Sequence, residues 1–570
     1  MTKALGILAL VLVAAGECSG LRLDDDSYQH FARSFHQVST LDVRAWVLDL
    51  WNKPLPGLIY GVAGLLGIAG ARLVSVAFTV ATAVLTARLC ERLIPFENRR
   101  NSWTFALFFV AQMAVLKDSF VTMTEIPAAF FLALSLWLCV VRGERRASAL
   151  AAGLVSLCRA EMLPVTCFVG VWLALDVWRA SDERAKKALR CALPPVLALL
   201  PFAAWVGAGV AVSGDASWFR RNSYAYIRSW DLAGVLHYNV ITGLPAVIAL
   251  PALLLFLIGV LDVLHGRDEA ARWQLSLLAG ALAIHYLLLN SLAVFPRGWY
   301  GLPSGHAIAA VNARNYTPTA PIAAVFVALG VAAWVNARQN RPRFAVLASV
   351  AAAATACAIA FGRIVTGSLR VLELSLLALM LLVLLLTSRL RLRYDPYDIW
   401  KFAALVTLGS SLLIRPFFWY PTRWNDRRAA SIQALSTMVR KEGPARVIQD
   451  LASSLGVFGN LQGVDATWTY PHEFSRRLED APPNTILVLE LDANGKPLPR
   501  YPVELRAQIS GAPHSVGRRF EVVGRFDSPA QPSWLTLVDR VASANAPVHW
   551  LALRFCRDCG TALSSLAVNP

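Results

Sequence analysis

The sequence predicts a polytopic α-helical membrane protein with a polar C-terminal domain. Hydrophobic residues make up 56% of the 570 residues and charged residues only 16%, and the mean hydropathy is +0.50. This balance is too apolar for a soluble protein of this size. Apolar stretches long enough to cross a bilayer recur as far as residue 417. After Tyr420 the composition turns polar over a length sufficient for a domain with its own core.

We predict about thirteen membrane helices, taking about 17 to 25 apolar residues as one span. They fall near residues 4–20, 73–95, 103–118, 127–142, 147–160, 162–178, 190–212, 240–264, 273–293, 318–336, 344–362, 369–389 and 399–417. We expect the first span to be uncleaved, because cleavage of a signal peptide near Gly20 would leave an acidic run at the new N-terminus. One long tilted helix over 147–178, in place of two short ones, would place every later loop on the opposite side of the membrane.

The basic residues fit one orientation of these spans. They fall in alternate loops, so all of them can face the cytoplasm. The clusters are Lys3, Arg92/Arg99/Arg100, Arg142/Arg145/Arg146, Arg179 to Arg190, Arg267/Arg272, Arg338/Arg341/Arg343 and Arg389 to Lys401. The net charge of +17 is therefore explained by the basic residues of the predicted cytoplasmic loops, and we expect no nucleic-acid partner. We expect an inner (cell) membrane protein of a bacterium, with segments 21–72, 119–126, 213–239 and 294–317 outside the cytoplasm.

Two domains are predicted. Residues 1–417 form a membrane domain that includes the external segment 21–72, and residues 418–570 form an extracytoplasmic α+β domain. Within the external segment, Leu58 to Ile68 is too short to span the bilayer comfortably. We expect an interfacial helix that roofs a cavity, with a buried re-entrant segment as the alternative.

The C-terminal domain shows both helical and strand patterns. Apolar residues at helical spacing predict a helix within Arg423 to Arg440, and apolar runs predict strands at 485–491, 520–523 and 548–555. Cys556 and Cys559 form a single CxxC pair, which is weak support for a zinc site. Outside the cytoplasm a local disulfide is the expected structure.

Three adjacent aspartates, Asp24, Asp25 and Asp26, follow the first apolar stretch, where a membrane helix would emerge into water. Like charges at this spacing disfavour joint ionisation. One interpretation is an acidic turn that starts a helix, since carboxylates complement the N-terminal end of the helix dipole. The other is a functional site, because ionisable residues at a membrane boundary are site candidates by default.

Two further acids lie on the same predicted side. Glu125 opens the fourth span before Pro127, and Glu161 follows Arg159 at the turn between the fifth and sixth spans. Each has a structural alternative: an ordinary first helical turn for Glu125, and an ion pair that holds the turn for Arg159 and Glu161. Because all of them are predicted to be external, we expect them to surround one cavity with the aspartates.

Arginines in the later external loops supply the opposite charge. Arg220 and Arg221 lie among aromatic residues, a pattern that at a bilayer interface binds lipid headgroups or a lipid phosphate. Arg314 is a candidate phosphate ligand because a guanidinium can hold two phosphate oxygens at once. Its alternative is snorkelling from a helix end.

The order of these motifs carries a family resemblance. The segments concerned are Asp24-Asp25 with Tyr28, Asn52-Lys53-Pro54-Leu55-Pro56 with Ala71-Arg72, Thr124-Glu125-Ile126-Pro127, and Arg314-Tyr316 with Pro321. Over roughly the first 340 residues the chain resembles GT-C class glycosyltransferases, most closely the group of protein O-mannosyltransferases and lipid A aminoarabinose transferases. That family usually has Asp-Glu where this chain has three aspartates.

The resemblance implies an enzyme that moves a sugar, with inversion, from a polyprenyl-phosphate donor to an envelope lipid, glycan or protein. It implies Asp24 or Asp25 as general base with Asp26 in support. The implied substrate-binding residues are Arg72, Glu125, Arg159, Glu161, Arg220, Arg221, Arg314 and Tyr316. A divalent cation on Asp24, Asp26 and Glu125 is left open, because hard cations take carboxylate oxygens but some relatives need no metal.

Three other functions compete with this one. A transporter or flippase for a lipid-linked substrate would show internal repeats and charges near the bilayer midplane, whereas these acids are predicted at helix ends. An envelope polymer ligase or polymerase would use a diphosphate-linked donor, which Arg220 and Arg221 would suit. A non-catalytic scaffold would leave the external acids unexplained.

The threading predicts that a tag after Pro570 is labelled by a membrane-impermeant reagent applied from outside the inner membrane, because the C-terminal domain follows an outward-directed last span. A tag inserted after Ser181, in a loop predicted to be cytoplasmic, is the matched control and should stay unlabelled. Labelling of the Pro570 tag only after permeabilisation would contradict the threading.

Overall fold

The computed structural model describes most of the N-terminal part of the chain and the strands of the C-terminal part. The described residues are 2–18, 25–50, 52–94, 102–180, 184–219, 250–266, 269–289, 313–338, 341–361, 368–389, 396–414, 434–435, 437–444, 446–449, 484–491, 503, 519–528 and 548–556. The chain forms two compact units: Met1–Glu17 with Asp42–Phe418, and Cys18–Leu41 with Trp419–Pro570. The first unit ends next to the predicted domain boundary, and Cys18–Leu41 groups with the C-terminal unit.

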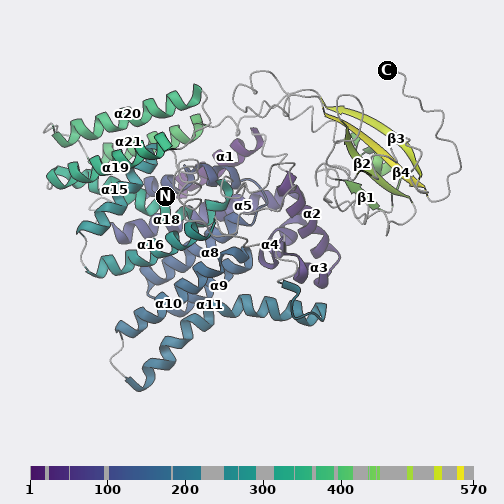
Figure 1. The fold of residues 1–570 in the computed structure, drawn as a ribbon, viewed down its shortest axis with the longest axis horizontal. Coiled ribbons are helices and arrows are strands. Elements are labelled where there is room, and N and C mark those ends of the chain that lie inside the picture. Colours follow the sequence, from purple (N-terminus) through teal and green to yellow (C-terminus); the bar gives the residue numbers. More distant parts are fainter. Residues whose placement is uncertain are drawn as a thin grey trace. The chain divides into compact units, whose positions relative to one another are not determined.

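The described secondary structure of the first unit is helical (Figure 1). Its α-helices are α1 (Thr2–Cys18), α3 (Val43–Leu48), α4 (Pro54–Gly64), α5 (Gly67–Leu93), α6 (Ser102–Val110), α7 (Met113–Asp118), α8 (Glu125–Trp137), α9 (Arg145–Cys158), α10 (Leu163–Ala180), α11 (Arg184–Ser213), α15 (Leu250–Gly266), α16 (Glu269–Leu289), α18 (Ala320–Val335), α19 (Arg341–Phe361), α20 (Ser368–Arg389) and α21 (Pro396–Ile414). Short 3-10 or π turns are η3 (Leu138–Arg142), η4 (Ala160–Met162), η6 (Ala313–Thr319) and η7 (Asn336–Arg338).

Where they fall on described residues, the predicted spans coincide with helices, with one difference; residues 240–249 and 290–293 of two of them lie outside the described residues. The predicted break within 147–178 is confirmed, because α9 ends at Cys158 and α10 begins at Leu163. The single span predicted at 103–118 is wrong, because a turn at Gln112 divides it into α6 and α7. The buried Gln112 side chain donates to the carbonyl oxygen of Ala320 at 2.7 Å, so a tertiary bond stabilises the break.

Five helical stretches in the described residues are long and apolar enough to cross a membrane. They are Gly67–Leu93, Glu125–Arg142, Ala160–Ala180, Ala188–Ser213 and Asn315–Val335. The total of about thirteen spans stays a prediction.

Helix α18 occupies the centre of the first unit, with 94% of its apolar window buried. It crosses α15 where the two backbones approach closely. A Cβ atom on Gly259 would lie 2.0 Å from the carbonyl oxygen of Phe326, and one on Gly330 would lie 1.9 Å from that of Leu255. Both positions therefore need glycine, as is usual where membrane helices pack backbone to backbone.

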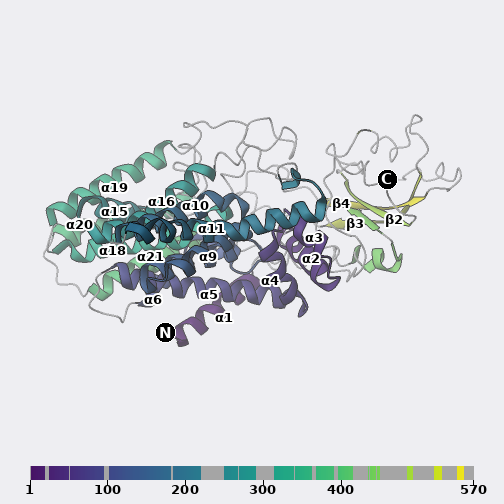
Figure 2. The same ribbon diagram turned by 90° about the horizontal axis from the view of Figure 1, so that it is seen from below.

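The helix predicted at 58–68 corresponds to α4, which begins and ends four residues earlier, and Leu65 and Leu66 form a turn between α4 and α5 (Figure 2). Prolines occupy the first and third positions of α4. Gly67 begins α5 with φ of 79°, a conformation open to glycine at little cost. The location of α4 at a membrane interface stays a prediction.

Short helix α3 is fixed to the end of α11 by aromatic side chains. The indole of Trp205 donates to the carbonyl oxygen of Val47 at 2.8 Å, and Trp205 meets Trp218 edge-on with ring centroids 6.2 Å apart. The indole of Trp46 donates to the carbonyl oxygen of Pro54 at 2.7 Å. These bonds tie the segment before α4 to the helices around the candidate site.

The second unit contains α2 (Asp25–Ser39) and one four-stranded sheet, visible in Figure 1. Its strands β1 (Arg446–Gln449), β2 (Thr485–Leu491), β3 (Arg519–Ser528) and β4 (Val548–Cys556) lie in the order β1-β2-β4-β3. The β1–β2 pair is parallel and the other two pairs are antiparallel. The three predicted strands are confirmed, and the four-residue β1 was not predicted. Residues 434–435 and 437–440 of the predicted helix are helical, and Cys559 lies outside the described residues.

Replacing Gly330 by alanine should destabilise the first unit, because the new methyl group would overlap the backbone of α15. Overpacking of this kind costs about 1–3 kcal/mol. Thermal unfolding in detergent measures the effect. Gly207→Ala in α11 is the matched control, since nothing lies within 4 Å of its Cβ position. Equal melting temperatures for the two variants would contradict the close crossing.

Candidate functional site

The candidate site is built around Arg159, which stands between α9 and α10. The chain leaves α9 with Arg159 in an extended conformation, at φ of −147° and ψ of 106°, and then turns through η4 into α10. This sharp reversal directs a long side chain away from both helices. The residue is 9% exposed, so its charge must be satisfied by protein groups.

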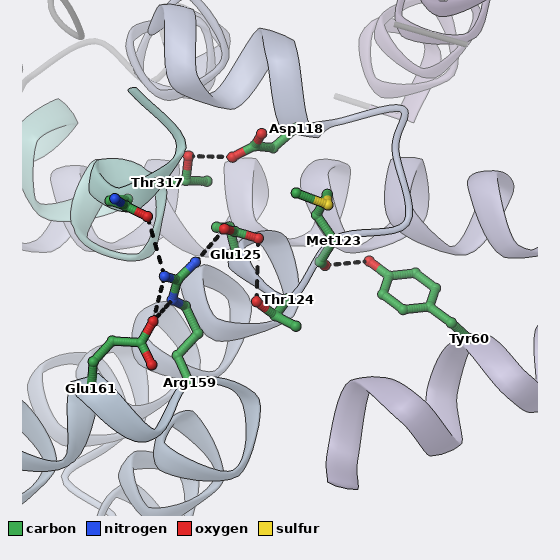
Figure 3. A network of polar contacts seen from close by, with 9 residues as sticks. Tyr60, Asp118, Met123, Thr124, Glu125, Arg159, Glu161 and Thr317 are labelled. Carbon is green, nitrogen blue, oxygen red and sulfur yellow. Dashed lines mark hydrogen bonds and ion pairs between the residues drawn. The ribbon is translucent and has the colours of Figure 1, made fainter. Parts of the chain in front are cut away.

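Three side chains surround the guanidinium (Figure 3). Its Nη1 atom donates to Oε1 of Glu125 at the start of α8, and its Nε atom donates to Oε1 of Glu161 at 2.7 Å. Its Nη2 atom also pairs with Glu161 and donates to Oδ1 of Asn315 in η6 at 3.2 Å. One guanidinium therefore joins α8, the α9–α10 turn and η6, and it uses the fork of donors that only arginine offers.

The charges of this cluster nearly balance. The side chains of Glu125 and Glu161 are 3% and 22% exposed, and together they carry one more charge than Arg159. Lys53 lies partly buried near them. Burial lowers the pKa of the Lys53 ammonium, while the negative charge of Glu161 opposes this shift. The four side chains therefore form one electrostatically coupled group.

The start of α8 is held in place by its neighbours. In the segment before it, the carbonyl oxygen of Met123 accepts a bond from the Tyr60 hydroxyl at 2.9 Å, and that of Val121 accepts one from Ser75 at 2.7 Å. On the other side, Thr317 donates to Oδ2 of Asp118 at 2.6 Å. Figure 3 shows the bonds from Tyr60 to Met123 and from Thr317 to Asp118 near Glu125. The segment that leads into α8 is thus held by bonds from α4, α5 and η6.

The structure brings three of the predicted site residues into direct contact. Glu125, Arg159 and Glu161 were predicted to surround a cavity, and they form an ion cluster. The alternative for Arg159 and Glu161, an ion pair at the turn, is confirmed. The predicted start of a helix at Glu125 is also confirmed. Whether these residues touch a substrate stays a prediction.

Arg72 and Tyr316 lie in packed surroundings. Arg72 is 8% exposed, and its guanidinium carbon lies 5.1 Å from the ring centroid of Phe120, within cation–π range. Tyr316 is 1% exposed and meets Tyr286 edge-on at 5.1 Å. Their predicted roles in substrate binding are not tested by these contacts.

The remaining predicted residues are described in part or not at all. Asp24, Arg220 and Arg221 lie outside the described residues. Asp25 and Asp26 begin α2, and Arg314 lies in η6, but their side chains are not described.

A helix does start at Asp25, as the acidic-turn interpretation expects, and this leaves the functional interpretation open. Among the described residues no group of three His, Cys, Asp or Glu side chains is arranged to hold a metal ion. Because Asp24 is not described, the cation site predicted at Asp24, Asp26 and Glu125 stays a prediction.

Two members of the cluster were not predicted as site residues. Lys53 stands in the Asn-Lys-Pro-Leu-Pro segment that was noted only for its family resemblance, and its place as the one lysine in the sequence of segment 21–72 was the available signal. Asn315 lies between Arg314 and Tyr316, both of which were predicted. A neutral amide gives no charge pattern, so its role as an acceptor for Arg159 could be found only from the structure.

Comparisons with known proteins identify the fold. No protein-family model matches the sequence, and no curated protein is significantly similar to it. The structure is similar to the crystal structure of ArnT from Cupriavidus metallidurans in the apo state, with 13% identity over 97% of each chain and a TM-score of 0.55. It is also similar to ArnT from the same organism bound to undecaprenyl phosphate, with 12% identity over 96% of this chain and 97% of that chain and a TM-score of 0.54.

ArnT is the lipid A aminoarabinose transferase, a GT-C protein. The predicted GT-C-like fold is therefore confirmed, and the similarity extends well beyond the N-terminal part on which the resemblance was based. Together with the five apolar helices, this fold makes the chain an integral membrane protein.

Replacing Arg159 by alanine should lower stability strongly, because the buried carboxylate of Glu125 and the partly buried carboxylate of Glu161 would lose the guanidinium that pairs with both. Breaking a buried pair from one side costs about 3–5 kcal/mol. Denaturant or thermal unfolding in detergent measures the loss. Arg88→Ala is the matched control, because its pair with Glu91 is exposed and should cost less than about 1 kcal/mol. A loss no larger than that of the control would contradict the buried cluster.

Proposed function

We propose that the protein is a membrane glycosyltransferase that transfers a sugar from a polyprenyl-phosphate donor to an envelope lipid, glycan or protein. The carrying observation is the buried charged cluster around Arg159, at one end of the helices of a fold similar over its whole length to ArnT. One ArnT structure holds undecaprenyl phosphate, and this supports a polyprenyl phosphate as the ligand. We place the active site outside the cytoplasm at an inner membrane, as the threading predicts.

In this proposal Arg159 is a positioning residue. Its donors are taken by Glu125, Glu161 and Asn315, so it has little capacity left for a substrate phosphate. Its task is to hold the start of α8 against η6, where the predicted phosphate ligand Arg314 lies. A fixed arrangement of charged groups is what transition-state stabilisation requires.

Lys53 is a candidate for direct contact with the donor. Burial disfavours its charged form, and the carboxylates of Glu161 and Glu125 only partly offset this. An incoming phosphate would add negative charge and raise the pKa of Lys53 again, because an opposite charge nearby favours the protonated amine. Phosphate binding and protonation of Lys53 would then stabilise each other.

The proposed reaction is an inverting displacement at the anomeric carbon of the sugar. The carboxylate of Asp24 or Asp25 accepts the proton of the acceptor hydroxyl or amine while that oxygen or nitrogen attacks. The bond between the anomeric carbon and the phosphate oxygen breaks, and the lipid phosphate leaves with the electron pair. Its growing charge is stabilised by cations, for which Arg314, Arg220, Arg221 and Lys53 are the candidates. The polyprenyl tail stays in the bilayer throughout.

Asp24→Asn or Asp25→Asn should lower the rate of sugar transfer by the purified protein at least about 100-fold, as is typical for loss of a general base. Asp26→Asn should have a smaller effect. Transfer from polyprenyl-phosphate sugars to envelope lipids, glycans and proteins is followed by mass spectrometry of the products. Asp398→Asn, an exposed carboxylate at the start of α21, is the matched control and should keep full activity.

The same assay separates the proposal from its competitors. Full activity in all three variants of the triplet would refute the catalytic assignment. Transfer from polyprenyl-diphosphate donors alone would identify a ligase or polymerase. Movement of intact donor across vesicle membranes without transfer would identify a flippase.

A further inference from the structure

A second charged region lies at the opposite end of α9 from Arg159. Two neighbouring cavities open there, of about 520 Å³ and 770 Å³, and they share Gly143 and Arg145 in their walls. The smaller lies among η3, α10 and the start of α16, and the larger lies among the starts of α9 and α11 and the end of α10. Both belong to the first unit and are separate from the cluster around Arg159.

The described lining of these cavities is strongly positive. Six arginines contribute to it against the two carboxylates of Glu144 and Asp176. The arginines are Arg92, Arg142, Arg145, Arg146, Arg179 and Arg190. Arg142, Arg145 and Arg179 pair with Glu144, Asp176 and Glu269, so six arginines face three carboxylates and the surroundings of the cavities keep a net positive charge that suits an anion.

The wall of the smaller cavity is rigidly built. Trp172 and Trp273 stack with ring centroids 4.9 Å apart, and the indole of Trp273 donates to Oδ1 of Asp176 at 2.8 Å. Arg145 donates to the other carboxylate oxygen of Asp176 at 2.7 Å, and the guanidinium of Arg179 lies 4.4 Å from the Trp273 ring centroid. Asp176 is thus occupied in holding the wall, and it neutralises only part of the arginine charge.

Apolar residues also border the larger cavity. Val177, Leu193 and Pro194 contribute to its lining. Nearby on α10 and α11, Trp178 is 54% exposed and Leu189 is 79% exposed. Only 17% of the apolar window of α11 is buried inside the protein. A ligand here would have its charged part among arginines and its apolar part along α11.

The role of arginines in setting the orientation of membrane helices does not by itself explain why these arginines line two cavities. Arginines that act only on membrane orientation need to be near helix ends, but they need not line a cavity or stack on a fixed tryptophan pair. We propose that the two cavities bind the phosphate headgroup of an anionic phospholipid of the surrounding bilayer, with its acyl chains along α10 and α11. Basic pockets between membrane helices are suited to such headgroups.

Short-chain phosphatidylglycerol and phosphatidylcholine of equal chain length, titrated into the full-length protein in detergent, test this site. Thermal stabilisation reports binding. We expect binding of the anionic lipid only, and a loss of affinity of roughly 30-fold in the double variant Arg146→Gln/Arg190→Gln, from two cations near a phosphate. Both arginines are exposed, so the variant should fold. Arg272→Gln, an exposed arginine of α16 outside the cavity lining, is the matched control and should bind as wild type.

Several outcomes would overturn the proposal. Equal binding of the two lipids would exclude a headgroup-specific site. Equal affinity of the double variant and the Arg272→Gln control would exclude these cavities. Stabilisation by inorganic phosphate to the same extent would show that a free anion suffices. Tighter binding of a short-chain polyprenyl phosphate, lost in the double variant, would assign the cavities to the carrier lipid instead.

Discussion

The buried guanidinium of Arg159 is the interaction on which the candidate site depends. A charge removed from water is costly unless it is paired and fully hydrogen-bonded, and the cost is greater in a membrane protein, where water is scarce. Here two carboxylates and an amide meet that requirement, and they come from three separate segments of the chain. Because the buried guanidinium needs all of these partners, α8, the α9–α10 turn and η6 must keep fixed positions relative to one another. None of the three can shift without uncovering an unpaired ion.

The packing of α15 against α18 also stabilises the cluster around Arg159. Because Gly259 and Gly330 let α15 and α18 approach backbone to backbone, α18 has a fixed place in the core. Turn η6 precedes α18 directly. The crossing of α15 and α18 therefore also fixes the positions of Asn315 and Thr317. The break between α6 and α7 is tied to α18 as well, through the bond from Gln112 to Ala320. Core packing and the polar cluster therefore position the same segments of the chain.

Much of this fold could be predicted from the sequence, and the failures have physical causes. The start of α8 at Glu125 and the break after Cys158 were predictable, because charged residues interrupt apolar runs there. The strand at 485–491 was predictable from its apolar run. The division of 103–118 was missed, because nothing local breaks that helix and a distant carbonyl oxygen stabilises the turn. The part played by Asn315 was missed because an amide acquires its role only from its partner.

If α9 crosses the bilayer, as the sequence predicts for residues 147–160, its length has a consequence for the surrounding lipid. It has 14 residues and is therefore about 21 Å long, shorter than the hydrocarbon thickness of about 30 Å that most bilayers maintain. Arg145 begins it and Arg159 follows its last residue, so the two charged regions cannot both lie at headgroup level on opposite faces of an undisturbed bilayer. A helix of this length that crosses the bilayer would be in hydrophobic mismatch, which local thinning or a polar recess covered by protein would relieve. Either way, reacting groups near Arg159 would work below the level of the neighbouring headgroups, at a depth that a lipid-linked phosphate reaches without leaving the membrane.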